Sequence, residues 1–568
     1  MTDPLLDLPL ALTRWFRVAG VVIGAAVATF GFWGRRTGLL DYRPGGTAFG
    51  ENVLPILSIG LAVAVAIAFR WEIIGGALTA FLGAGLAVFA ANQLVPWHAA
   101  AMVAGFAIPA LLWLAVDLAD LPPQRALVGV AISAVLAIAG AVVAQATYSG
   151  IWGPTHPDSE VVELPDSPVR WAWSGAVSHT GAEIRMLPDN PGSNVQLELS
   201  TDEAFNAVRT LVPDDTYGSV VGFKLESLAP NSDYHYRFVV DGEVDSVRTG
   251  HFATFPLGPA SFTIAVGSCA RVGSNGAVFD AIRANDPLVY LAVGDLHYGD
   301  NNRDDIERFR EVMDLTLAQP AQSALYRSVP VAYVWDDHDY AGNDSGGDAR
   351  SRASAMSAYR EYVPSYALAG ADSAVYQSFT VGRVRIIMTD ARAARDLDPF
   401  PGSDQMSMLG TEQRKWLENE LVTAADDHAL VIWVNPVPWV AEAADGADHW
   451  GGYSAERRHL ADLIASNDID NLLMVSGDAH MIAIDDGTNT DYSSSGGAGF
   501  PLIHAAPLDR PGGIKGGPYS HGAIAEGGQF ATIEIDDDGE RVEVLLTGRD
   551  WQNLERLSYR FLAASRPG

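Results

Sequence analysis

The stretch Val289–Asn301, VYLAVGDLHYGDN, joins an apolar half to a polar half at Gly294. The polar half presents four metal-capable side chains within six positions, namely Asp295, His297, Tyr298 and Asp300. A parallel strand that ends in a Gly-Asp turn places a carboxylate at the carboxyl edge of a sheet, where open α/β folds build their sites. Carboxylate, imidazole and phenolate groups suit a hard or borderline metal. The stretch therefore indicates a metal-binding strand end, with an acidic loop as the alternative.

The acidic charge lies almost entirely after residue 150. The whole chain has 69 acidic and 37 basic residues and a formal net charge of −32, whereas residues 1–150 carry seven of each sign. So acidic a surface argues against a nucleic-acid partner, because phosphate backbones require clustered Lys and Arg. The single cysteine, Cys269, excludes an intramolecular disulfide. It is either a ligand or nucleophile, or a small buried hydrophobe.

Residues 1–150 contain five apolar runs of about the length that a bilayer requires. The runs are Val18–Trp33, Val53–Phe69, Ile73–Val95, Ala99–Val116 and Ala126–Ala146. Five runs exclude a simple secretory signal and predict a multi-pass membrane region, which would bind the lipid bilayer as an anchor or a small sensor module. With the amino terminus inside, everything after Ala146 is exported, although the positive-inside bias is weak.

Residues 158–257 change to short alternating runs separated by turn signals, a pattern typical of a β-sandwich. The segment LAPNSDYHYRF (228–238) resembles the tyrosine-corner segment of immunoglobulin-like and fibronectin type III domains, with Tyr234 as the corner tyrosine. No catalytic cluster stands out here. We therefore expect a domain that packs or positions substrate rather than an independent binding module.

Residues 260–560 alternate apolar strand runs with helical stretches, which predicts an α/β domain. Six strand runs end in chemically capable residues: FTIAVGSC (262–269), LVYLAVGD (288–295), VAYVWDDHD (331–339), VRIIMTDAR (384–392), ALVIWVNPVP (429–438) and NLLMVSGDAH (471–480). Thiolate, phenolate and imidazole together suit iron(III), and the surplus carboxylates suit a second, harder cation such as calcium or magnesium. Asp295 could bridge two cations, and paired metals activate a water for in-line displacement at phosphorus.

Seven ordered motifs resemble the alkaline phosphatase D (PhoD-like) family of metallophosphoesterases. They are GSCAR (267–271), GDLHYGD (294–300), VWDDHD (334–339), TDARAAR (389–395), LGTEQRKWLENEL (409–421), HWGGYSAERRHLADLI (449–464) and SGDAH (476–480). The sandwich, with WSGAV (173–177), is similar to that family's amino-terminal domain. The GDxxY pattern also resembles purple acid phosphatases, but Cys269 replaces their first aspartate motif and their closing GHxH is GDAH here.

The resemblance implies a role for each matching position. Cys269, Asp295 and Tyr298 would bind iron(III), and Asp478 with His480 would complete a binuclear or polynuclear site that also holds calcium or another divalent cation. Asp337 stands where the superfamily has a metal-binding asparagine, and His338 would protonate the leaving oxygen.

Other positions stay open between two interpretations. Asn435 is either a ligand or a turn residue before Pro436, and His297 lies either behind the site or at the surface. Arg392 and Arg395 contact phosphate or form salt bridges. Of Asp336 and Asp339, one could reach a metal and the other could orient His338, or both could face solvent.

The sequence thus predicts transmembrane helices (1–150), a fibronectin- or immunoglobulin-like β-sandwich (158–257) and a metallophosphoesterase domain (260–560) of two sheets flanked by helices. The expected function is a membrane-anchored, extracytoplasmic phosphohydrolase that attacks mono- or diesters with a metal-activated hydroxide. One alternative is a phosphodiesterase specialised for phospholipid or cell-wall polymer. The other is an inactive membrane receptor or structural module.

Overall fold

The computed structural model describes residues 59–60, 63–64, 67, 72–93, 123–151, 158–368, 374–397, 406–510 and 512–564. The chain divides into two compact units, Met1–Trp152 and Gly153–Gly568. The second unit holds the sandwich-like strands together with the α/β strands, and it carries the chemistry.

The first unit contains helices α3 (Glu72–Gln93) and α5 (Pro123–Ile151), which pack against each other. They cover most of the third apolar run and all of the fifth. The runs at 18–33 and 99–116, and most of the run at 53–69, lie outside the described residues. Within the described ranges, no helix combines the length and the apolar character needed to cross a bilayer.

The predicted sandwich strands form two sheets that face each other. On one side lie β1 (Val169–Gly175), β2 (Ala182–Pro188), β5 (Asp215–Tyr217) and β6 (Val220–Leu225). On the other lie β3 (Val195–Ser200), β4 (Arg209–Leu211), β7 (Asp233–Val240), β8 (Glu243–Val244) and β9 (Gly250–Ala253). Phe223 and Phe238 meet across the gap with ring centroids 6.2 Å apart. The tyrosine corner is confirmed, because the Ala229 amide donates to the Tyr234 hydroxyl at 2.8 Å.

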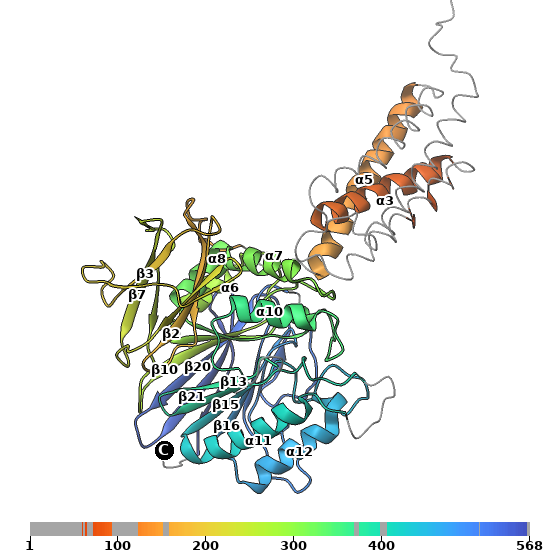
Figure 1. The fold of residues 1–568 in the computed structure, drawn as a ribbon. Coiled ribbons are helices and arrows are strands. Elements are labelled where there is room, and N and C mark those ends of the chain that lie inside the picture. Colours follow the sequence, from red (N-terminus) through yellow and green to blue (C-terminus); the bar gives the residue numbers. More distant parts are fainter. Residues whose placement is uncertain are drawn as a thin grey trace, which may run out of the picture. The chain divides into compact units, whose positions relative to one another are not determined.

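One sheet runs without a break from the sandwich-like strands into the α/β strands (Figure 1). The junction is a parallel pairing of β1 with β12 (Val331–Val334), in which Gly175 lies opposite Val331. A Cβ on Gly175 would lie 2.5 Å from the Val331 carbonyl oxygen and 2.6 Å from that of Pro364. Glycine is therefore required at the point where the two regions join.

The six strand runs of the α/β part are confirmed, and the structure divides them equally between two sheets. Strands β10 (Phe262–Gly267), β11 (Val289–Val293) and β12 run parallel in the ten-stranded sheet. Strands β14 (Val384–Met388), β15 (Leu430–Val434) and β16 (Leu472–Ser476) run parallel in a seven-stranded sheet. The outer strands are β20 (Gln529–Asp537), β21 (Val542–Asp550) and β22 (Glu555–Leu562) in the first sheet and β13 (Gln377–Val381), β17 (Ile482–Asp485), β18 (Leu502–Ala505) and β19 (Ala523–Ile524) in the second.

Side chains alternate between two cores along the strands of the seven-stranded sheet. In β15, Leu430, Ile432 and Val434 join the core shared with the ten-stranded sheet. Val431 and Trp433 join a second core with helices α11 (Gly410–Asp427) and α12 (Ser454–Ser466). Helices α7 (Ile306–Leu317) and α8 (Pro320–Ser328) pack against β1 of the ten-stranded sheet. The sheets therefore lie back to back between helical layers.

The sequence predicts helical stretches at 304–318, 351–362, 411–425 and 454–467. They are confirmed as α7, α10 (Arg352–Tyr362), α11 and α12, with ends shifted by at most two residues. Three further α-helices of the described residues, α6 (Val278–Arg283), α8 and the short α9 (Asp337–Tyr340), did not stand out in the sequence.

Candidate metal centre

Three of the expected ligands occupy equivalent places at three strand ends. Cys269, Asp295 and Asp478 each lie two residues beyond the ends of β10, β11 and β16. All three have left-handed backbones, with φ of 65°, 51° and 53°. Such conformations cost a residue with a side chain about 1–2 kcal/mol, and they persist mainly where function holds them.

The edges of the two sheets meet at Gly477. A Cβ at this position would lie 2.2 Å from the Val293 carbonyl oxygen of β11 and 2.7 Å from Ser268 Oγ after β10. The Gly477 amide also donates to the Pro436 carbonyl after β15 at 2.8 Å. This close approach brings the polar ends of four strands into one cluster.

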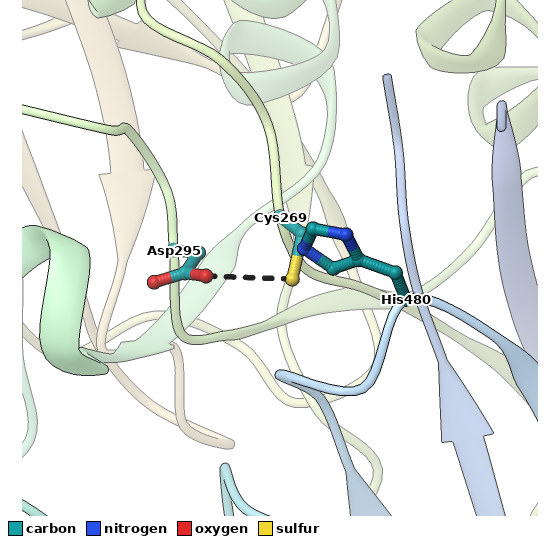
Figure 2. A group of neighbouring side chains, drawn as sticks. All are labelled: Cys269, Asp295 and His480. Carbon is teal, nitrogen blue, oxygen red and sulfur yellow. Dashed lines mark hydrogen bonds between the residues drawn. The ribbon is translucent and has the colours of Figure 1, made fainter. Parts of the chain in front are cut away.

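The first metal-capable group consists of Cys269, Asp295 and His480, shown in Figure 2. Cys269 Sγ lies 3.5 Å from Asp295 Oδ2. The Tyr298 hydroxyl lies 2.9 Å from His480 Nε2, so the phenolate expected from the sequence joins the same group. The Arg510 guanidinium lies over the Tyr298 ring, 4.3 Å from its centroid.

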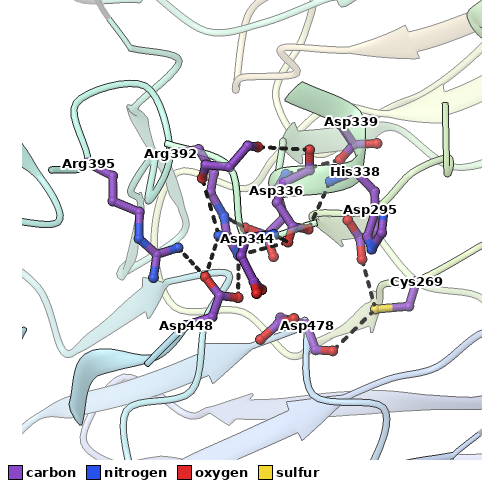
Figure 3. Close-up of polar contacts among 12 residues, drawn as sticks. Cys269, Asp295, Asp336, His338, Asp339, Asp344, Arg392, Arg395, Asp448 and Asp478 are labelled. Atoms are coloured by element: carbon purple, nitrogen blue, oxygen red, sulfur yellow. Dashed lines mark hydrogen bonds and ion pairs between the residues drawn. The ribbon is translucent and has the colours of Figure 1, made fainter. Parts of the chain in front are cut away.

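Two further groups continue from the first. Asp295, Asp337 and His338 form the second, and Asp337, Asp344 and Asp448 form the third. Asp295 is thus shared by the first two groups and Asp337 by the last two, and Figure 3 shows most of these side chains converging. A chain of shared carboxylates is an arrangement that fits more than one cation.

Two buried oxygen atoms without hydrogen-bond partners indicate that these residues fit a cation. Asp295 Oδ1 and Asn435 Oδ1 are buried and accept no hydrogen bond. Asn435 Nδ2 donates to the Val437 carbonyl at 2.6 Å, which orients the amide with its oxygen free. The turn contact is present, and the free oxygen leaves the interpretation of Asn435 as a ligand a prediction. Unpartnered buried oxygens among carboxylates, a thiol and imidazoles suit a metal.

Burial shifts the ionisation of the cluster. It raises the pKa of Asp295 to about 8 and that of Asp478 to about 6, and it also raises the pKa of the Cys269 thiol. Neighbouring carboxylates add to each of these shifts. A bound cation would favour the ionised forms, so the cluster is poised to exchange protons for metal.

Asp300 is the carboxylate that contacts the ring of His338. Its Oδ1 lies 2.5 Å from His338 Nδ1. Burial opposes protonation of His338, but Asp300, Asp337 and Asp295 together raise its pKa well above the usual range. Neither Asp336 nor Asp339 has this role, contrary to the expectation that one of them orients His338.

Asp336 and Asp339 are buried and support the site from behind, so the solvent-facing alternative is wrong for both. Asp339 accepts the amides of His297 and Asp336, each at 3.0 Å. His297 is buried as well, and its ring nitrogen lies 3.5 Å from Asp339. Asp336 forms an ion pair with Arg392.

Arg392 and Arg395 form the salt bridges that the sequence left as the alternative to phosphate contact. Arg392 pairs with Asp336 and with both oxygens of Asp448, at 2.6 and 3.2 Å for the latter. Arg395 pairs with Asp448 and donates to the Tyr453 hydroxyl at 2.8 Å. The two guanidinium groups hold the pKa of Asp448 below its ordinary value even though burial opposes this.

Sequence reasoning missed Asp344, Asp448 and Lys515, which all contribute to the cluster. Asp448 directly precedes the HWGGY motif, and that adjacency was a usable signal. Lys515 lies in a glycine-rich segment, GGIKGG, with no strand run to mark it. Its Nζ lies 2.7 and 2.9 Å from the two oxygens of Asp478.

Comparison with known protein families agrees with this geometry. Residues 264–512 match the family described as PhoD-like phosphatase. The chain is 27% identical over 339 residues to alkaline phosphatase D of Bacillus subtilis (strain 168), an alignment that covers 50% of this chain and 58% of that protein. It is 30% identical over 230 residues to an uncharacterized protein of Mycobacterium tuberculosis (strain H37Rv), covering 37% and 40% of the two chains. The chain therefore spans about half the length of these curated relatives.

Two solved structures share the fold. The structure of PhoD has a TM-score of 0.54 at 17% identity and covers 71% of this chain and 94% of its own. The purple acid phosphatase PPD1 from yellow lupin seeds has a TM-score of 0.51 at 14% identity, covering 71% and 75%. At these identities the likeness establishes the fold alone, which is of the metallophosphoesterase type expected from the motifs.

Proposed function

We propose that the chain is a metal-dependent phosphoric ester hydrolase of the alkaline phosphatase D type. The observation that carries the proposal is the run of three metal-capable groups that share Asp295 and Asp337. A structural or receptor module has no need for buried carboxylates in such numbers, because each costs free energy when it is left without a cation. The match of residues 264–512 to the PhoD-like phosphatase family supports the same reaction class.

The residues of the site divide the work between binding and proton transfer. Cations bound here would act as Lewis acids and lower the pKa of a water molecule. Cys269, Tyr298 and His480 would hold iron(III), because thiolate and phenolate donors suit it, and Asp337, Asn435 and Asp478 would hold calcium or another divalent cation. His338 keeps its Nδ1 against Asp300, which leaves Nε2 to donate a proton to the departing ester oxygen.

The proposal includes a membrane anchor and an extracytoplasmic site. Its support is the set of five apolar runs before residue 150, together with the strong acidity of the remaining chain. Cysteine labelling of intact cells tests it, with a single reactive cysteine placed at the exposed position Asp305 in a Cys269→Ser background. Labelling that requires cell lysis would contradict the proposed orientation.

Metal analysis and hydrolysis of p-nitrophenyl phosphate by the purified full chain test the activity. We expect tightly bound iron with a divalent cation, and Asp295→Asn should remove most of both the metal and the turnover. Asp305→Asn, which changes an exposed acid near the same loop, is the matched control. A metal-free wild-type chain without hydrolysis would favour the receptor or structural alternative.

A further inference from the structure

Lys515 is more exposed to solvent than Arg392 and Arg395, the two arginines that contact the acids of this cluster. Its Nζ contacts both oxygens of Asp478, at 2.7 and 2.9 Å, and lies 3.9 Å from Asp448 Oδ2. The Lys515 side chain is 41% exposed, whereas those of Arg392 and Arg395 are 0% and 2% exposed. Because both arginines are enclosed by their own carboxylates, Lys515 is more accessible to a solute than either of them.

The backbone around Lys515 is fixed to the site. The Tyr519 hydroxyl donates to the Lys515 carbonyl at 2.9 Å. The Gly513 amide donates to the His480 carbonyl and the Gly517 amide to the Val440 carbonyl, both at 2.8 Å. The two glycine bonds tie the segment to a candidate ligand on one side and to the loop after β15 on the other, and the Tyr519 bond closes the segment on itself. Hydrogen bonds therefore hold the backbone at Lys515, and the ammonium group changes position by rotation of its side chain.

Gly516 shows that the position of this segment is specified by the sequence. Its φ of +70° lies in the left-handed region, and a Cβ there would come within 2.1 Å of the Val440 carbonyl oxygen. A residue with a side chain would push the segment, and Lys515 with it, away from the cluster. Gly516 thus helps to fix the distance between the Lys515 ammonium group and the cluster.

The residue type matters as well as its place. The chain has only three lysines, at 224, 415 and 515, among its 37 basic residues. An ammonium group is a compact charge with three donors on a rotatable stem, whereas guanidinium has a fixed planar fork. A lysine can therefore exchange one anionic partner for another without a change in its backbone.

We propose that Lys515 binds a non-bridging oxygen of the substrate phosphoryl group and thereby favours phosphomonoesters over phosphodiesters. The inference rests on the proposed function for its substrate class. A cation bound to the Asp478 carboxylate would compete with the Lys515 ammonium group for the same two oxygens. The ammonium group would then be free to face an incoming phosphate. A monoester carries about −1.5 to −2 charges at neutral pH. A diester has one ionisable oxygen fewer, so the ammonium group stabilises a bound monoester more than a bound diester.

Lys515→Gln, which keeps most of the side-chain length, tests this in the metal-loaded full chain. Isothermal titration with inorganic phosphate should show affinity reduced by about tenfold or more, the usual effect of losing a charged hydrogen bond. KM for p-nitrophenyl phosphate should rise similarly, with a smaller effect on bis(p-nitrophenyl) phosphate. Lys515→Arg should recover part of the phosphate affinity. Lys415→Ala, at an exposed position of α11, is the control and should match wild type.

The outcomes separate this inference from the proposed function. A wild-type chain that hydrolyses neither ester, yet binds phosphate through Lys515, would refute the function and support the phosphate contact. Phosphate affinity unchanged in Lys515→Gln would overturn the contact whether or not the chain is an enzyme. Metal content should be equal or higher in this variant, because a competitor for Asp478 is gone. A loss of metal that accounts for the whole loss of affinity would show that Lys515 serves only to hold the acids together.

Discussion

Asp300 Oδ1 lies 2.5 Å from Nδ1 of His338, and both side chains are largely enclosed. The contact fixes the ring of His338 and is the largest of the effects that raise its pKa against the effect of burial. It makes Asp300 a positioning residue for the proposed proton donor, in the way that a carboxylate orients a histidine in other sites.

Asp300→Asn should lower the pKa of His338, so that the proton donor is lost at a lower pH than in wild type. The protonated form of His338 is present below its pKa and is lost above it. When the pKa falls, the alkaline limb of the rate profile should therefore move to lower pH. The shift should be larger for an alkyl phosphate than for p-nitrophenyl phosphate, whose leaving group needs less protonation.

Asp305→Asn serves as the control for this comparison, because Asp305 is exposed and lies on the same connection before α7. Metal content should be unchanged in both variants. Equal rate losses for the good and the poor leaving group would count against a proton-donor role for His338.

The metal-free protein should become less stable as pH rises from about 4 to 8. Burial raises the pKa of Asp295 to about 8 in the folded chain, whereas an unfolded aspartate has a pKa near 3.9. The folded state therefore holds this proton more tightly, and the stabilisation is complete below about pH 4 and lost as pH passes 8. The slope amounts to at most about 1.4 kcal/mol per pH unit for one group.

Asp295→Asn removes this titration, so its metal-free melting temperature should depend less on pH and exceed that of wild type at pH 8. Thermal unfolding of chelator-treated protein at a series of pH values provides the measurement. Parallel pH curves for the two proteins would show that Asp295 is ionised in the metal-free fold.

The strands and the polar residues at their ends could be predicted from the sequence, because apolar runs followed by polar turns are local signals. Tyr234 could be assigned for the same reason, since its partner Ala229 lies five residues away. The partners of Arg392 could not, because Asp336 and Asp448 each lie 56 residues from it and no local pattern records such ion pairs.

The continuous sheet that joins the two regions could not be predicted from the sequence either. A boundary between the sandwich and α/β regions follows from the change of pattern near residue 258, but Gly175 pairs with Val331 across that boundary. Lys515 was missed for a related reason. Its place is set by contacts of Gly513 with His480 and of Gly517 with Val440, which belong to other parts of the chain.

Cys269→Gly and Cys269→Ala should both lose iron but differ in stability. Both remove the thiol, and the backbone of Cys269 has a φ of 65°, which costs alanine about 1–2 kcal/mol more than glycine. The greater chain entropy of glycine in the unfolded state offsets part of this difference. Iron content and the melting temperature of the metal-free variants should therefore separate ligand loss from backbone strain. A Cys269→Ala protein with normal iron and turnover would remove Cys269 from the ligand set.

Gly175→Ala should destabilise the Gly153–Gly568 unit by about 1–3 kcal/mol, as overpacking of a tight contact does. The added methyl would collide with two carbonyl oxygens, those of Val331 and Pro364, at the junction of β1 with β12. Because β12 leads directly into Asp336 and Asp337, turnover should fall along with the melting temperature. Gly258→Ala is the control, since a Cβ there meets nothing within 4 Å. If Gly175→Ala melts and turns over like Gly258→Ala, the two regions do not depend on the shared sheet.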